Sequence, residues 1–513
     1  MTDLPASAAP AAPALAAAAL AVPAYGPPTA APAVPTRALW LTGAEPGPGP
    51  LDAFLDALRA SGDPAADDDA RGIGRAGLGR QARAFFAALA PDPMMSGTAV
   101  TPALPVALRR MEADPQFAPL VAHLRTRLRL CPTCDGVHRP AWIDRARVLA
   151  GQRAFMTRML PSVLVLLCKS LPEGYAAPGM AEVLNLSGEL ARRPYHRLMG
   201  TLQLLVTVCT PGSFEGPHFP AFVAAEQMRL LHASIRSVVA PRATEPVRMP
   251  VEWEGEGLAG PEYEVWPGYA AFVAGGAGRA PRLPINHEDM LGTIIGFSLL
   301  VVDGLEELGI PFTPAEAAAY YEVWRTFGVL MGIHPPGHVD EPGYFPPDLE
   351  AARAMYAAYK RRNYVGPEQV RAANRAPARA ANPAGYALAS SHVHMLGHLL
   401  QHATRTTWIP ESWWTRVPRF YVRTLAGEAG YARLGLPDDG VHGLLRLVLL
   451  RLPRAWARLF RRTDSVVHAA LSRWLLSALV AEVYGGPVAY PVPDTLDDLR
   501  AFVRAAPGRA PVQ

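Results

Sequence analysis

The stretch that decides the fold is R-L-M-G-T-L-Q-L-L-V-T-V, residues 197–208, followed by E-Q-M-R-L-L-H-A-S-I-R-S-V-V, residues 226–239. Both segments are largely apolar, and a Pro/Gly-containing break separates them. Because each segment repeats its apolar positions at helical spacing, the sequence predicts two neighbouring helices.

Ionisable side chains follow one face of each predicted helix. Arg197 and Thr201 are four residues apart in the first, and Arg229, His232 and Arg236 are three and four apart in the second. Ionisable groups that face inward need partners. A bound anionic cofactor containing a metal would supply them, because a neutral imidazole can ligate the metal while guanidinium groups pair with carboxylates. The alternative is a core histidine that neighbouring groups satisfy.

The two segments resemble the helical haem oxygenase family that contains the latex-clearing proteins (rubber oxygenases) and the MpaB-type oxygenases. In that family an Arg-xxx-Thr motif on one helix faces a haem, and the proximal ligand is the histidine of an Arg-xx-His-Ala motif on a later helix. The matching residues here are Arg197, Thr201, Arg229, His232 and Ala233.

Two further blocks extend the resemblance. N-H-E-D-M-L-G-T runs from Asn286 to Thr293, and the weaker W-I-D-R-A-R-V-L-A-G-Q begins at Trp142. The blocks follow one another in the order of the family and cover about half of the chain, from near Trp142 to Pro335. Several blocks in order are more specific than any one alone.

The resemblance implies an all-α fold with a globin-like helical core and additional N- and C-terminal helices. It also implies haem b held without covalent bonds. His232 would be the proximal ligand of the haem iron, with Arg229 and Arg236 near the propionates. Arg197 and Thr201 would lie on the distal side, where they orient oxygen or the catalytic base.

The resemblance also implies a carboxylate base and contains one departure. In latex-clearing members a glutamate at about this distance before the Arg-xxx-Thr motif is proposed as the base. Glu182 matches it, Glu173 and Glu189 are nearby alternatives, and a solvated surface glutamate is the non-catalytic interpretation.

The latex-clearing members carry a lysine just before the threonine, and this lysine can occupy the sixth iron position. Here it is Gly200, so the distal site should be open or water-bound.

Composition excludes several classes of protein. The net charge of the 513 residues is +4 without long basic runs, so no nucleic-acid-binding surface is expected. Four cysteines are too few for a disulfide framework. No Lys or Arg precedes Arg37, so a basic signal region is missing, and no apolar run reaches the roughly 20 residues of a membrane span. We therefore expect a cytoplasmic protein, whereas latex-clearing proteins are typically exported. The oligomeric state is unknown.

The sequence divides into five segments. They are a disordered Ala/Pro-rich leader (1–35), an N-terminal helical segment (36–120), the haem-binding core (121–345), a C-terminal helical region (346–490) and a flexible tail (491–513).

Local signals within the core predict individual helices. The 144–170 stretch reads as a helix that is broken or kinked at Pro161. Asn286 can cap the helix of the second block, and Thr313 can start another that runs to Met331. The Glu/Gly/Pro-rich stretch of residues 242–284, which follows the His232 segment, reads as a lid, a mouth or an irregular excursion.

Two other clusters of potential metal ligands occur in the sequence. Cys131 and Cys134 form a C-x-x-C pair that could be half of a zinc site with His138, although a structural site needs four ligands. Covalent haem attachment is excluded because Asp135 stands where that motif needs histidine. A turn with two thiols is the simpler interpretation.

The second cluster is the stripe His394, His398 and His402, at four-residue spacing. A zincin helix needs Glu directly after its first histidine, and here Met395 stands there. A boundary face with polar partners is the alternative to a metal site.

The function that we expect is haem b-dependent cleavage or oxygenation of an alkene by O2, in an isoprenoid-like or other small apolar substrate. Two alternatives stay open. One is a non-catalytic helical binding protein of the same fold, and the other is a metal-dependent hydrolase that uses the His394 stripe. Strand signals are scarce and no Gly-rich phosphate loop occurs, which agrees with an all-α fold.

Overall fold

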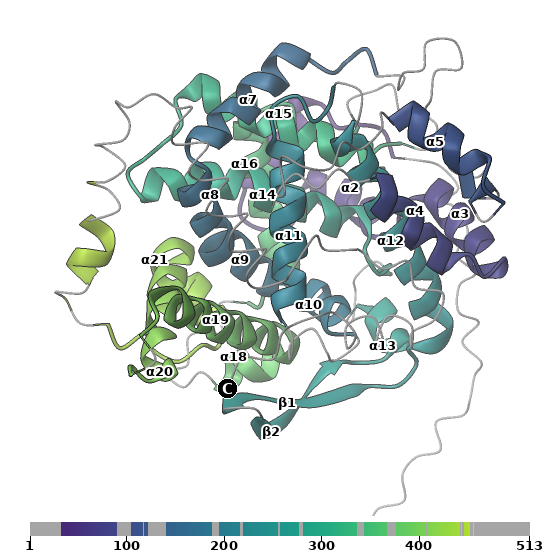
Figure 1. The fold of residues 1–513 in the computed structure, drawn as a ribbon. Coiled ribbons are helices and arrows are strands. Elements are labelled where there is room, and N and C mark those ends of the chain that lie inside the picture. The colour runs from purple at the N-terminus through teal and green to yellow at the C-terminus, as the bar shows by residue number, and fades with distance from the viewer. Residues whose placement is uncertain are drawn as a thin grey trace, which may run out of the picture.

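The computed structural model describes residues 32–89, 104–115, 140–186, 194–215, 219–254, 257–275, 281–335, 343–366, 376–406 and 408–441, with scattered positions near 118 and 448. Within these ranges the fold is predominantly all-α, as the sequence predicts, with one small β-hairpin (Figure 1).

The helices before the core are short. They are α1 (Arg37–Leu41), η1 (Thr42–Ala44), α2 (Pro50–Arg59), α3 (Pro64–Arg75), α4 (Gly79–Leu89) and α5 (Leu104–Glu112). The middle of the chain forms α7 (Arg145–Thr157), α8 (Met159–Val165), η2 (Leu166–Ser170), α9 (Leu171–Tyr175), α10 (Pro178–Asn185), α11 (Pro194–Cys209) and α12 (Pro220–Arg242).

The later elements complete the body. They are β1 (Val247–Glu254), β2 (Gly257–Trp266), α13 (Tyr269–Ala274), α14 (His287–Glu307), α15 (Pro314–Leu330), α16 (Leu349–Asn363), α18 (Ala376–Ala381), α19 (Pro383–Thr404), α20 (Glu411–Trp414) and α21 (Arg416–Arg433).

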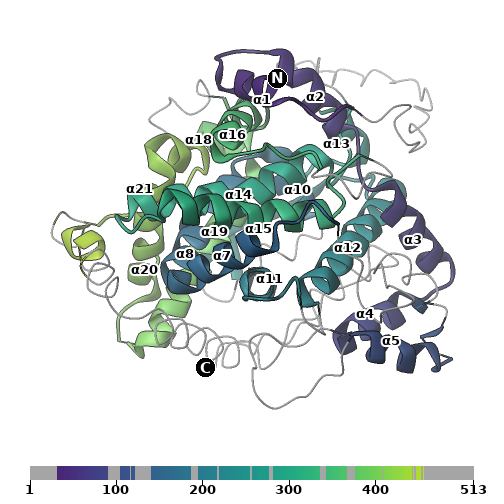
Figure 2. The ribbon, with the colours of Figure 1, turned by 90° about the horizontal axis from the view of Figure 1, so that it is seen from above.

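Helix α14 lies in the middle of the body in both ribbon views (Figure 1, Figure 2) and packs against α15, α16, α8 and η2. It is apolar around nearly its whole circumference, which is typical of a buried helix. Its start confirms the predicted cap, because Asn286 Oδ1 accepts a hydrogen bond of 2.9 Å from Asp289 N. A capping box between Thr313 and Glu316 likewise starts α15.

The predicted break near Pro161 falls at Arg158, between α7 and α8. The two helical stretches meet at 86°. Proline clashes with the carbonyl group four residues earlier when both lie in one helix, and that residue is Thr157, the last of α7. The chain therefore turns before the clash would occur. Pro161 then lies in the first turn of α8, where a missing N–H costs no helical hydrogen bond.

Close helix packing in this region depends on a glycine. An ideal Cβ added to Gly151 of α7 would lie 2.2 Å from the carbonyl oxygen of Ala319 in α15. Only a residue without a side chain permits this approach of the two backbones. Helices α7 and α15 are consequently one of the most closely packed pairs of the described fold.

The prediction of an irregular excursion over residues 242–284 is wrong for its first half. The chain there forms the antiparallel hairpin β1–β2, with register shifts between Val247 and Arg248 and between Pro250 and Glu252. Proline inside β1 obscured the strand pattern. A two-stranded ribbon tolerates it, because each strand has one edge that needs no ladder hydrogen bond.

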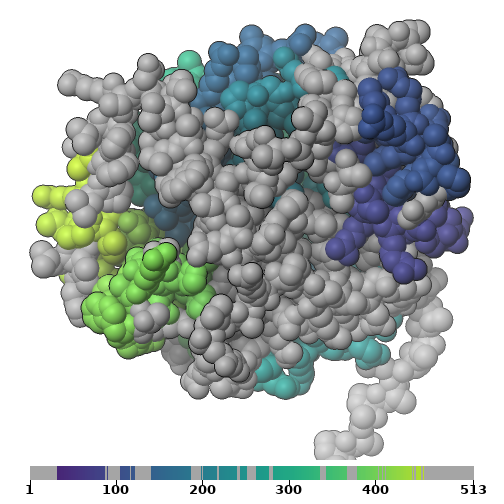
Figure 3. All heavy atoms as spheres, viewed as in Figure 1, coloured from purple at the N-terminus to yellow at the C-terminus, as the bar shows by residue number. Residues whose placement is uncertain are grey.

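The early helices pack on the body rather than forming a separate unit. Figure 3 shows α3 to α5 at one edge of the viewed face and the helices after α18 at the opposite edge. Helix α3 lies along α12, which carries His232. Among the described residues, no single helix is long and apolar enough to cross a membrane, and one bent pair, Arg145–Thr157 with Met159–Tyr175, passes that test by length and composition together.

Candidate cofactor site

The structure brings the two defining segments together as α11 and α12, which pack against each other. In the described part of the connection between them, residues 210–215, Gly212 has a φ of +85°, a conformation that favours glycine. Thr201 of α11 is half-buried and Gly200 is buried. The side chain of Arg197 lies outside the described part of the chain, although its backbone belongs to α11, one turn before Thr201.

His232 has the properties of a neutral ligand. Its Nδ1 atom is buried and has no hydrogen-bond partner in the described structure. Burial lowers the pKa of His232 to about 3, and the positive charge of Arg236 acts in the same direction. The imidazole is therefore neutral at pH 7, which is the form that donates a lone pair to a metal.

The two arginines beside His232 are held by carboxylates of the N-terminal segment. Arg229 Nε lies 2.6 Å from Asp63 Oδ2, and its Nη2 lies 3.2 Å from Asp63 Oδ1. Its Nη1 atom donates to Glu226 at 2.9 Å. Burial alone would lower the pKa of Arg229, but these two acids outweigh it and raise the pKa above its ordinary value.

Arg236 repeats the arrangement two turns further along α12. Its Nε donates to Asp67 Oδ1 at 2.8 Å, and its Nη1 donates to the Ile285 carbonyl oxygen at 3.0 Å. The guanidinium groups that we expected near haem propionates thus have protein partners. This arrangement differs from the expectation, and a direct contact of Arg229 or Arg236 with haem stays a prediction.

The sequence interpretation missed Asp63 and Asp67. Asp63 caps α3 by accepting from Ala66 N at 3.1 Å, and Asp67 is one turn later on the same face. Both side chains are buried. Asp63 and Asp67 are four residues apart, whereas Arg229 and Arg236 are seven apart. The two pairs form only because α3 and α12 lie side by side, so no local sequence pattern predicts them.

His287 is a second buried histidine near this cluster. It is 2 % exposed, and neither ring nitrogen has a hydrogen-bond partner in the described structure. Its backbone N–H donates to the Ser61 carbonyl oxygen at 2.9 Å, two residues before Asp63. Burial lowers the pKa of His287 to about 3, so this ring is also neutral.

Glu182 lies in α10, where its charged neighbours are Arg282, Glu264 and Asp289. Burial raises the pKa of Glu182, Arg282 opposes the shift, and the two acids add to it. A carboxylate with a raised pKa is suited to accept a proton near neutral pH. This environment supports Glu182 as a base but does not connect it to α12.

The alternative bases have different surroundings. Glu173 is buried in α9, where its Oε2 accepts from the Tyr356 hydroxyl at 3.2 Å and from the Tyr364 hydroxyl at 3.5 Å. Glu189 lies outside the described residues.

The described residues contain no group of three or more His, Cys, Asp or Glu that could hold a metal, and the stripe His394, His398 and His402 is therefore not such a group. The ring of His394 instead makes a 2.8 Å hydrogen bond to the Ser390 carbonyl oxygen within its own helix. Residues 131–138, with the C-x-x-C pair and His138, lie outside the described part of the chain.

Comparisons with known proteins find one family match and one structural match. Residues 162–429 match the family model of the ER-bound oxygenase mpaB/B'/rubber oxygenase catalytic domain. A search of curated protein sequences finds no significant match. Among solved structures, the chain is similar in fold to a latex clearing protein in its closed state, with 15 % identity and a TM-score of 0.50 over 82 % of this chain and 91 % of that one.

The family match covers more than half of the chain and spans α8 to α21, including the segments that carry Thr201, His232 and the Asn286 block. The chain therefore belongs to the oxygenase family of mpaB/B' and the rubber oxygenases.

Proposed function

We propose that the protein is a haem b-dependent oxygenase that uses O2 to cleave or oxygenate the double bond of a small apolar substrate such as an isoprenoid. The family supports an oxygenase. The observation that carries the haem assignment is His232, whose ring is neutral and whose buried Nδ1 has no partner on a helix packed against α11.

The residues present fit haem better than a bare metal ion. A lone imidazole is a poor site for a free ion, because such an ion needs several protein ligands, whereas haem brings four nitrogen atoms of its own. When bound, haem would supply an iron centre that binds and activates O2. His232 would be its proximal ligand, and the Asp63–Arg229 and Asp67–Arg236 pairs would fix the helix that holds this ligand.

The protein's own residues would then position the substrate and move a proton. Arg197 and Thr201 share one face of α11, which we assign to the distal side. Glu182 would remove an allylic proton from the substrate, since its raised pKa brings its basicity closer to neutral pH. Buried apolar residues of α11 and α12 would suit an apolar substrate and exclude water.

The first test is spectroscopic and independent of the substrate. We expect protein purified after expression with a haem supply to show a Soret band, and His232→Ala to stay helical while losing most of it. His402→Ala is the matched control, because His402 is exposed on α19. A full Soret band in His232→Ala would overturn the ligand assignment, and a colourless wild-type protein would overturn haem dependence.

The second test identifies the reaction. A panel of terpenoids and unsaturated lipids is incubated with the haem-loaded enzyme, and oxygen uptake is followed with mass detection of products. Aldehyde or ketone fragments would identify cleavage, and a product heavier by oxygen atoms alone would identify oxygenation without cleavage. Oxygen uptake that no substrate stimulates would contradict this substrate class.

A further inference from the structure

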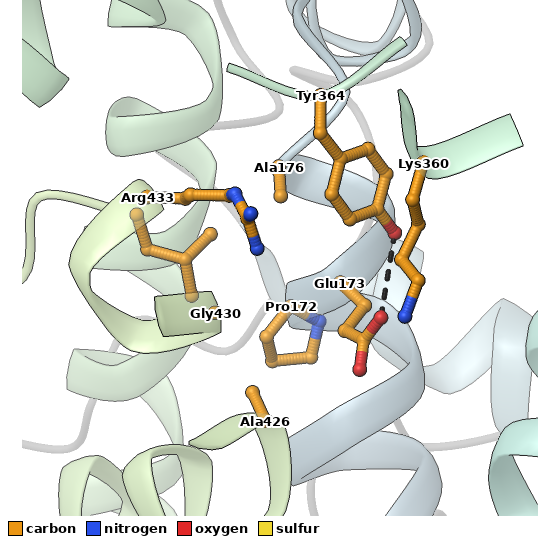
Figure 4. Close-up of a pocket in the computed structure, with 9 residues that line it drawn as sticks. Pro172, Glu173, Ala176, Lys360, Tyr364, Ala426, Gly430 and Arg433 are labelled. Atoms are coloured by element: carbon orange, nitrogen blue, oxygen red, sulfur yellow. Dashed lines mark hydrogen bonds between the residues drawn. The ribbon is translucent and has the colours of Figure 1, made fainter. Parts of the chain in front are cut away.

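A small pocket lies between α9, α16 and α21, and no residue of α11 or α12 lines it (Figure 4). Its cavity volume is about 40 Å³, which exceeds the space that one water molecule needs. The lining residues are Pro172, Glu173, Ala176, Lys360, Tyr364, Ala426, Gly430, Arg433 and Leu434.

Two cations enter this pocket without a carboxylate partner. Figure 4 shows the Lys360 amino group and the Arg433 guanidinium on either side of Glu173. Neither side chain makes an ion pair of 4 Å or less with any residue that the structure describes. Most buried or half-buried cations elsewhere in the described fold, such as Arg229 and Arg362, do have such partners.

Both cations are nevertheless held in position. The Lys360 Nζ atom lies 5.1 Å from the centre of the Tyr356 ring, and the Arg433 guanidinium carbon lies 5.9 Å from that of Tyr364. Arg433 Nε also donates to the Val365 carbonyl oxygen at 3.2 Å. These contacts restrict the two side chains, and none of them places a carboxylate at ion-pair distance.

The negative charge of Glu173 is already engaged from the protein side. Its Oε2 lies 3.2 Å from the Tyr356 hydroxyl and 3.5 Å from the Tyr364 hydroxyl, and these two hydroxyls hydrogen-bond each other at 2.7 Å, so at least one phenol donates to Glu173. Burial is the main cause that raises the pKa of both tyrosines, so both phenols remain protonated donors. The ionisable lining residues, Lys360, Arg433 and Glu173, together leave an excess of one positive charge.

Small residues of α21, the helix that also carries Arg433, form a further part of the pocket wall. Ala426 and Gly430 line the pocket, and the helix is interrupted between them at Gly427, where φ is +74° and ψ is 168°. A side chain larger than methyl at these lining positions would occupy the cavity. The helix thus leaves space directly beside the two cations, whose charge exceeds that of Glu173 by one.

We propose that this pocket is a binding site for a small oxyanion, a phosphate or carboxylate group that Lys360 and Arg433 contact together. The anion supplies the missing counterion and joins α16 to α21 through charge-assisted hydrogen bonds. It is either a free ion or the anionic end of a larger molecule whose remainder extends out of the pocket. The site is independent of the haem assignment, because no residue of α11 or α12 takes part.

The experiment is calorimetric titration of the full-length protein at constant ionic strength with inorganic phosphate, acetate and monobutyl phosphate. We expect saturable binding of at least one probe. Arg433→Gln and Lys360→Gln should each weaken it by about tenfold or more, because each removes one of two contacting charges. Arg416→Gln, on the exposed surface of the same helix, is the matched control and should bind as wild type.

The direction in which Glu173→Gln changes the affinity for the anion distinguishes a binding site from a structural contact. This variant removes the nearest negative charge while keeping the shape, so it should strengthen anion binding several-fold, whereas damage to a structural contact would weaken it. Preference for monobutyl phosphate would identify the end of a larger ligand, and equal or tighter binding of inorganic phosphate would identify a free ion. Absence of saturable binding by all three probes, or weaker binding in Glu173→Gln, would overturn the proposal. If Arg433→Gln fails to fold, Lys360→Gln on the half-buried rim decides the same point.

Discussion

Arg229 and Asp63 form a two-point ion pair across 166 residues of sequence, with N···O distances of 2.6 and 3.2 Å and with both side chains less than a tenth exposed. The pair joins the helix that carries His232 to a helix that precedes the family-matched region. A parallel pair, Asp67 with Arg236, fixes the same two helices two turns further along.

Asp63→Asn should therefore destabilise the protein strongly. Removal of one partner of a buried ion pair costs up to about 3–5 kcal/mol of the free energy of unfolding, and in this variant Glu226 is the remaining carboxylate partner of Arg229. Asp68→Asn is the control on the same helix, since its exposed pair with Arg71 is worth less than about 1 kcal/mol. Chemical denaturation of both variants measures the difference, and equal midpoints would show that the buried pair does not fix α12.

Glu182→Gln should retain the Soret band and lose activity by about 100- to 10,000-fold, the usual cost of removing a general base. A base acts in its ionised form, and burial raises the pKa of Glu182. The wild-type rate should thus fall with decreasing pH through a value above that of an ordinary glutamate. Glu264→Gln removes one of the acids that raise this pKa, so it should move the acidic limb to lower pH.

The pH profile of kcat/KM, measured for the wild type, Glu182→Gln and Glu264→Gln, tests the assignment of Glu182 as the base. A wild-type rate in Glu182→Gln together with inactivity of Glu173→Gln or Glu189→Gln would place the base elsewhere.

The glycine at position 200 leads to a prediction about the spectrum of the resting ferric enzyme. It has no side chain that could reach the iron, so the ferric enzyme should be high-spin or water-ligated, and imidazole should bind without displacing a protein ligand. Electron paramagnetic resonance and optical titration with imidazole measure both properties. A low-spin spectrum at neutral pH would mean that another side chain occupies the sixth position.

Two glycine substitutions separate close packing from helix propensity. Gly151→Ala should destabilise by about 1–3 kcal/mol, because its methyl group meets the Ala319 carbonyl oxygen. Gly296→Ala, inside α14, has nothing within 4 Å of the new Cβ and should be stabilising by up to about 1 kcal/mol. Thermal unfolding of both variants provides the comparison, and a neutral Gly151→Ala would mean that α7 and α15 can move apart.

Local signals predicted much of the helical framework, since their causes lie within a few residues. Asn286 and Thr313 start helices as expected because a cap needs only its own first turn. Tyr320, Trp324 and Phe327 of the helix that Thr313 starts are fully buried, at the four- and three-residue spacing of one helical face. The kink expected at Pro161 was placed three residues late, because a proline disturbs the turn before it.

Pairing between distant segments could not be predicted in this way. Asp63 and Asp67 resemble any acids near a helix start, and their importance depends on which helix lies alongside. The same applies to the pocket at Lys360 and Arg433, which three elements far apart in sequence assemble. The hairpin escaped notice because Pro250 and several glycines weaken a strand signal that cross-strand pairing restores.

The position of Asp63 and Asp67 also sets an order of events during synthesis. The ribosome releases α3 before Arg229 and Arg236 are synthesised. The carboxylates of Asp63 and Asp67 are therefore solvated until partners more than 160 residues downstream become available. Closing so long a loop delays the contact until the intervening helices have condensed. The segment that carries His232 is thus secured late, and a fragment trimmed to residues 162–429 would enter folding with two buried cations and neither of these counterions.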